Sequence, residues 1–165
     1  MFKTSFTLPL KVPWEKINLE EWLYGISSEQ YRAFSKKHIA MGRSIENLTD
    51  TLINVEKVCS CLMIHHYTPQ YLGKERVELY SDNTEGYFFG IIPVKFSVSW
   101  DMLVKPKTKA ESEFTCNIEV ELKTLKFMDY MGRWYVMPLL NRHNREETPN
   151  FVKSIEDKFR NNINF

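Results

Sequence analysis

The sequence has few cysteines, no long apolar run and no excess of charge of either sign. Three cysteines, Cys59, Cys61 and Cys116, are an odd number for a disulfide framework and indicate reduced thiols. The apolar stretch at residues 87–94 is far shorter than the roughly 20 residues that span a membrane. Residues 1–5 lack the apolar segment of a signal peptide. We therefore expect a cytoplasmic protein that does not cross a membrane.

The charges are nearly balanced. The chain carries 22 basic and 21 acidic side chains, for a net charge of +1. Its lysines and arginines are scattered among acids and do not form the basic stripe that nucleic acids attract, so nucleic-acid binding is not expected. At 165 residues without internal repeats, the chain is expected to form one domain over residues 1–165, large enough to bury a core without disulfides or a structural metal.

Alternating and helical patterns follow one another along the chain. Residues 4–10 alternate like a strand, and residues 18–34 have helical spacing with a break at Ser27–Glu29, which predicts two short helices. Residues 41–44 are interpreted as a turn. Further strands are predicted at residues 53–67, 76–80, 87–92, 95–104 and 111–123, with a hairpin tip at residues 105–109.

The last predicted element is a long amphipathic helix over residues 127–159. Its apolar stripe recurs at steps of three or four residues and comprises Val136, Leu140, His143, Glu147, Phe151, Ile155 and Phe159. Pro149 is expected to kink or restart this helix. The element order indicates an α+β fold in which a curved antiparallel sheet grips the last helix, with a ligand cavity between them.

Two ionisable side chains interrupt the apolar stripe. His143 and Glu147 are four residues apart and therefore project from the same helix face. Burying both is costly unless they pair or bind a cation. Their spacing is compatible with a simple ion pair at the edge of the stripe and with two ligands of a zinc site.

The remaining candidates for metal ligands lie in the predicted strand at residues 53–67. His65 and His66 are adjacent, point to opposite faces and are interpreted as structural residues. In one continuous strand Glu56 and His66 are about 33 Å apart, so they cannot share a metal. Cys59 and Cys61 have the opposite parity to Glu56 and are interpreted as packing residues.

Three segments resemble the 2,4-diacetylphloroglucinol hydrolase and phloretin hydrolase family. They are residues 21–38, ending in YRAFSKKH, residues 54–58, NVEKV, and residues 141–151, NRHNREETPNF. The resemblance implies a helix-grip fold of the Bet v 1 and START type, with zinc held by two His and two Glu. The matching residues are His38, Glu56, His143 and Glu147.

The activity implied by the resemblance is hydrolysis of a carbon–carbon bond between an acyl group and a phenolic ring. Tyr31 is similar to a family tyrosine that contacts the substrate and is the candidate catalytic residue, whereas residues 95–101 lack the family's hairpin histidine. That departure favours an alternative, a non-catalytic binding protein for a small apolar or aromatic molecule. Iron (Fe2+) is an alternative to zinc, since the same donors bind both, and a homodimer is left open.

Overall fold

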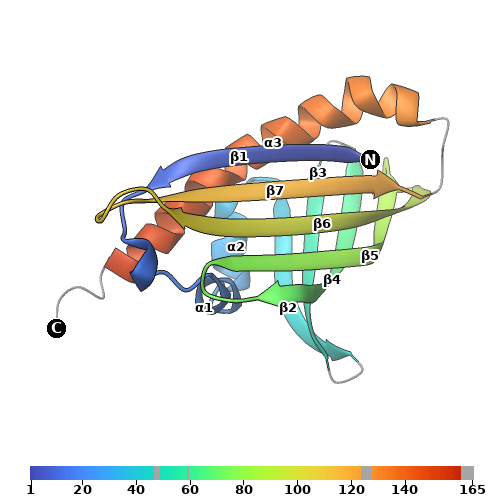
Figure 1. The fold of residues 1–165 in the computed structure, drawn as a ribbon. Helices are drawn as coiled ribbons and strands as arrows, with labels where there is room; N and C mark the ends of the chain where they lie inside the picture. The colour runs from blue at the N-terminus through green and yellow to red at the C-terminus, as the bar shows by residue number, and fades with distance from the viewer. Residues whose placement is uncertain (47–48, 59, 124–127, 161–165) are drawn as a thin grey trace.

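A seven-stranded antiparallel sheet curves around one long helix (Figure 1). The structure is a computed structural model that describes residues 1–46, 49–58, 60–123 and 128–160. The strands are β1 (Phe2–Leu10), β2 (His38–Glu46), β3 (Thr49–Val58), β4 (Cys61–Leu72), β5 (Arg76–Phe88), β6 (Ile92–Pro106) and β7 (Ser112–Leu122). The helices are η1 (Trp14–Lys16), α1 (Leu19–Tyr24), α2 (Ser28–Phe34) and α3 (Met128–Arg160).

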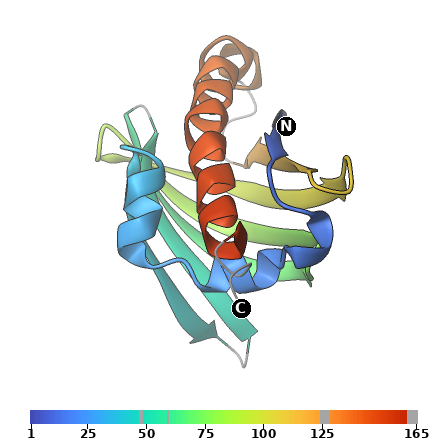
Figure 2. The ribbon, with the colours of Figure 1, turned by 90° about the vertical axis from the view of Figure 1, so that its left-hand side faces the viewer.

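The strand order is β1-β7-β6-β5-β4-β3-β2, so strands two to seven form a meander and β1 joins beside β7. Figure 2 shows α3 lying across the concave face of the sheet. Within the described part of the chain, no helix has the length and apolar character needed to span a bilayer.

The clearest sequence patterns are confirmed. In β7 the side chains of Phe114 and Cys116 are fully buried, as the alternation predicts. The two short helices separate where expected, because Ser27 caps α2: its Oγ accepts from the Gln30 amide, and Gln30 Oε1 accepts from the Ser27 amide. The stripe of α3 is also buried, from Leu140 at 8% exposure to Ile155 at 0%.

Two outcomes were expected at Pro149, a kink or a restart of the last helix. The restart does not occur. Helix α3 runs without a break from Met128 to Arg160 and contains both Pro138 and Pro149. Beside Pro149, Thr148 donates to the carbonyl of Asn144 at 2.6 Å. Burial of the helix face against the sheet outweighs the loss of a backbone hydrogen bond at proline.

The interpretation of residues 53–67 as one strand is wrong. The chain reverses between Val58 and Cys61, which are paired across β3 and β4. Glu56 therefore lies opposite Met63 rather than far from the histidines. The reversal carries no Gly, Pro or Asn, and its one turn-favouring residue, Ser60, is a weak signal.

Two other predictions in the sheet are also wrong. Residues 41–44 belong to strand β2, where Gly42 pairs with Ile53. Residues 76–88 form one strand, β5, with a bulge between Ser81 and Thr84 in place of the predicted loop. The turn comes later, at Phe89 and Gly90, whose φ angles are 52° and 76°.

Candidate functional site

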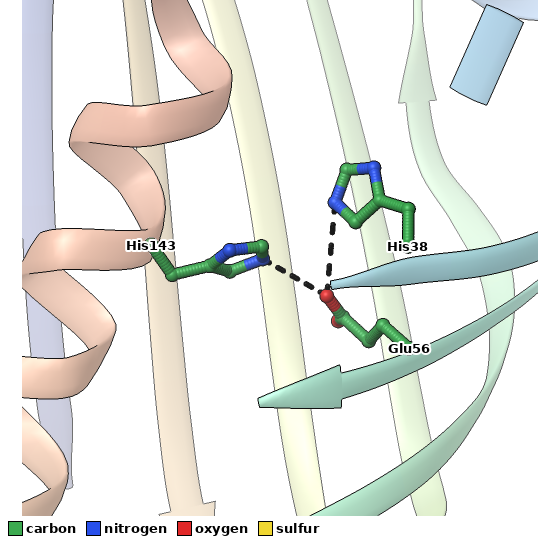
Figure 3. Close-up of side chains that lie close together, drawn as sticks. All are labelled: His38, Glu56 and His143. Atoms are coloured by element: carbon green, nitrogen blue, oxygen red, sulfur yellow. Dashed lines mark hydrogen bonds and ion pairs between the residues drawn. The ribbon is translucent and has the colours of Figure 1, made fainter. Parts of the chain in front are cut away.

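Four of the predicted site residues meet between the sheet and α3. His38 begins β2 and pairs directly with Glu56 of β3, while His143 and Glu147 project from successive turns of α3 toward them. Figure 3 shows His38, Glu56 and His143 converging. All four are buried, with exposures of 3–9%. The register of the β2–β3 hairpin and the spacing on α3 therefore bring together segments that are 109 residues apart.

Three of these residues could hold a metal ion together. His38, Glu56 and His143 each offer one ligand atom, and these atoms lie within 4.8 Å of one another. Glu56 Oε2 lies 2.9 Å from His143 Nε2 and 3.8 Å from His38 Nε2. Glu147 Oε2 approaches the two histidines, at 3.1 Å from His38 Nε2 and 3.4 Å from His143 Nε2, and is the candidate for a fourth ligand.

The histidine rings are oriented for such a site. His38 Nδ1 is 2.8 Å from the backbone carbonyl of Tyr31 and must donate, because a carbonyl only accepts. Its Nε2 then faces Glu147 Oε2, an acceptor. This contact needs a further proton, on the ring or on Glu147, or a cation between the two atoms. The ring of Tyr31 stacks on His38, with centroids 3.9 Å apart.

The electrostatics of the cluster are those of buried ion pairs. Burial lowers the pKa of His143, but the carboxylates of Glu147 and Glu56 outweigh it and raise the pKa to about 9. Burial acts to raise the pKa of Glu56, yet His143 and the hydrogen bond from His65 hold it well below its usual range. Two buried carboxylates thus require two positive charges nearby, from protons or from one divalent cation.

A further histidine, His65, contacts the cluster of four residues. The sequence pattern had indicated a structural role for it. His65 Nε2 lies 2.7 Å from Glu56 Oε1, the oxygen that does not face the other histidines. The contact exists because the chain reverses after Val58. The length of the predicted strand, 15 residues, was no signal, because β6 is also 15 residues long.

A cavity of about 110 Å3 adjoins the cluster. Tyr31, Asn54, Tyr67 and the cluster residues form its polar end, and the remaining lining is mostly apolar. That lining comprises Val58, Cys61, Met63, Phe88, Phe96, Val98, Trp100, Ile118, Val120, Leu122, Val136, Leu139 and Leu140. Cys61 therefore shares the inner face with Glu56, against the parity prediction, because of the reversal.

Two tyrosines flank the polar end. Burial, followed by the charges of Glu56 and Glu147, raises the pKa of both Tyr31 and Tyr67 well above the usual value, so both phenols stay neutral. Tyr67 was not among the predicted site residues; its ring stacks on His65, with centroids 5.2 Å apart. Both tyrosines can donate a hydrogen bond to a molecule in the cavity.

Two buried polar atoms in the described part of the chain lack a hydrogen-bond partner, and both belong to residues that line this cavity. They are Asn54 Oδ1 and His143 Nδ1. A buried polar atom without a partner costs about 1–3 kcal/mol. A polar group of a bound molecule would remove that cost.

Comparisons with known proteins establish the fold. No family model and no curated protein matches the sequence. Among solved structures, a protein from Thermus thermophilus aligns with a TM-score of 0.66 at 10% identity, covering 94% of this chain and 98% of that one. A START superfamily protein from Mycobacterium smegmatis gives 0.54 at 10% identity, covering 98% and 99%. The Zhui aromatase/cyclase from a Streptomyces species gives 0.60 at 6% identity, covering 98% and 94%.

At these identities the likeness concerns the fold alone. The α+β helix-grip fold predicted from the sequence is confirmed by these alignments and by the seven-stranded sheet around α3. The resemblance to the hydrolase family and the metal-binding role of the four residues stay predictions.

Proposed function

We propose that the protein binds a small, largely apolar or aromatic molecule in the cavity between the sheet and α3. The mostly apolar lining supports this, as do the two unpartnered polar atoms of residues at the polar end. At about 110 Å3 the cavity is smaller than one of about 150 Å3 that holds benzene, so a single-ring molecule fits if the cavity widens on binding. Among the structural neighbours, the protein from Streptomyces is named an aromatase/cyclase.

We further propose that His38, Glu56, His143 and Glu147 hold a divalent cation, with zinc as the first choice and Fe2+ as the alternative. One observation carries this proposal: Nε2 of His38 faces a carboxylate oxygen while its Nδ1 already donates to a carbonyl. A cation among the four atoms satisfies this contact and balances both carboxylates at once. Two nitrogen and two oxygen donors suit zinc and ferrous iron alike.

The finer proposal is hydrolysis of a bond between an acyl carbon and a phenolic ring, as the family resemblance implies. A bound zinc, taking a fifth ligand beside the four side chains, would polarise the acyl carbonyl and lower the pKa of a water. Water adds its hydroxide to the acyl carbon, the bond between that carbon and the ring breaks, and the ring carbon takes up the remaining proton of the water, which leaves a carboxylic acid and the deacylated ring. In this proposal Tyr31 orients a substrate hydroxyl or delivers that proton. The structural neighbours support the binding function more than this reaction.

Metal content and ligand turnover test these proposals separately. Elemental mass spectrometry is applied to the wild type, to His143→Ala and Glu147→Ala, and to His66→Ala as the matched control on the opposite face of β4. We expect about one zinc per chain, lost in the first two variants only. A wild type that cannot be loaded with zinc or iron overturns the metal proposal.

The same samples are then mixed with 2,4-diacetylphloroglucinol. Calorimetry measures binding, and chromatography detects acetate and the deacylated ring. Release of acetate by the wild type but not by Glu147→Ala supports the hydrolase. Binding without turnover leaves the binding function and overturns the hydrolase for this substrate class, and the absence of binding counts against an acylphenol ligand.

A further inference from the structure

The two carboxylate oxygens of Glu56 have different partners. Oε2 faces the candidate metal position, 2.9 Å from His143 Nε2 and 3.8 Å from His38 Nε2. Oε1 points away and accepts a hydrogen bond of 2.7 Å from Nε2 of His65. A carboxylate can bind a cation through one oxygen or through both. The bond from His65 occupies one oxygen and leaves the other for a cation.

His65 is itself held from behind by hydroxyl groups. Its Nδ1 lies 3.2 Å from Thr84 Oγ1, which in turn lies 2.8 Å from Ser81 Oγ. Ser81 and Thr84 are three residues apart and would face opposite sides of a regular strand. The bulge in β5 between them turns both side chains inward, where both are fully buried. Bulges commonly re-aim a side chain beside a functional site.

The ring of His65 has little freedom. It is 2% exposed, and Tyr67 stacks on it at an interplanar angle of 12°. Both ring nitrogens have protein partners, so His65 is not available as a fifth ligand. Its position is that of a residue that does not contact the metal but orients a metal ligand through a hydrogen bond.

We infer that His65 is a positioning residue of the candidate metal centre, which makes Glu56 a one-oxygen ligand, with the Ser81–Thr84 bulge fixing the ring. This inference rests on the proposed metal site. It explains the bulge in β5 and the position of His65. Neither lies in the three segments that resemble the hydrolase family. Loss of His65 would free Oε1, so that Glu56 either swings away or binds through both oxygens.

The test compares zinc affinity, measured against a competing chelator, across matched variants. His65→Leu removes the hydrogen bond, and we expect affinity to fall by about 10- to 100-fold. His65→Gln can place an N–H near the position of Nε2 and is expected to recover most of the loss. Thr84→Val removes only the outer hydroxyl and is expected to lie between wild type and His65→Leu. His66→Leu makes the same change on the opposite face of β4 and is the control.

Coordination is read independently from the visible absorption of bound Co2+, whose intensity falls as the number of ligands rises. We expect a changed band in His65→Leu, weaker where Glu56 comes to bind through both oxygens, and a wild-type band in His65→Gln. Far- and near-ultraviolet circular dichroism of the metal-free proteins monitors the fold. If His65→Leu does not fold, Thr84→Val and His65→Gln decide by the same readouts.

The outcomes separate this inference from the proposed function. A wild type that binds neither Zn2+ nor Co2+ overturns the metal site, and the inference falls with it. A wild type that binds both metals, beside folded His65 and Thr84 variants with unchanged affinity and spectra, overturns the inference alone. Reduced affinity with an altered Co2+ band in His65→Leu, and recovery in His65→Gln, supports it.

Discussion

The two halves of α3 pack against the same sheet in different ways. Toward the C-terminus, Phe151 and Ile155 are fully buried in a dense aromatic region. The ring of Phe151 contacts Trp22 and Phe34 edge-on, with centroids 5.7 and 5.1 Å apart. Trp100 lines the cavity, whereas Trp22, Phe34 and Phe151 belong to the buried core away from it.

Toward the N-terminus, the same stripe continues as Leu140, His143 and Glu147 and faces the cavity. Its charged groups are buried beside Glu56, and their pairing outweighs the effect of desolvation on the pKa values of His143 and Glu56. One helical periodicity therefore serves two purposes. The C-terminal half stabilises the fold at any pH, and the N-terminal half holds a polar site whose contribution to stability depends on pH.

The largest expected effect is in the dense half. Phe151→Ala removes a fully buried ring and should lower the free energy of unfolding by about 3–5 kcal/mol. Urea denaturation followed by circular dichroism measures the change. Trp134→Ala, on the same helix but 79% exposed, is the matched control and should change stability by less than about 0.5 kcal/mol. Equal losses in the two variants would contradict the assignment of the core.

A smaller effect is expected at the boundary between the halves. Leu140 is 8% exposed and already faces the cavity, so Leu140→Ala should cost about 2 kcal/mol, the lower end for this substitution. The enlarged cavity should bind a bulkier acylphenol more tightly than the wild type does. Calorimetry with matched small and large ligands measures this. A loss as large as that of Phe151→Ala would show that the cavity half is equally well packed.

The pH dependence of stability should be specific to the polar half. The pKa of His143 is raised from its ordinary 6.5 to about 9, so its stabilising contribution is complete below about pH 6.5 and is lost as pH rises through 9. The pKa of Glu56 is lowered from 4.5, so its contribution is present above about pH 4.5 and is lost on acidification. Thermal unfolding of the metal-free protein should show both losses.

Bound zinc should restore the stability that the metal-free protein loses at alkaline pH, since bound histidines are deprotonated and metal affinity rises with pH. His143→Gln should remove the alkaline loss in the metal-free protein, while Phe151→Ala should keep it at lower overall stability. An alkaline loss that persists unchanged in His143→Gln would assign it to another group.

The positions of residues in elements with strong periodicity could be predicted from the sequence. Contacts across a turn with a weak sequence signal could not. The spacing of His143 and Glu147 on an apolar stripe already required a partner for two buried charges, and the structure supplies Glu56 and His38. By contrast, the approach of His65 to Glu56 depends on a reversal whose one turn-favouring residue is Ser60. Pairing across such a reversal is a tertiary property that no local pattern encodes.

Anomalous diffraction at the zinc edge, from crystals grown with zinc, tests the central claim most directly. We expect one strong peak among the four side chains, about 2.0–2.2 Å from Nε2 of His38 and His143 and from one oxygen each of Glu56 and Glu147. A peak elsewhere in the molecule, or none at this cluster, would contradict the claim that the cavity half of α3 is built around a metal ion.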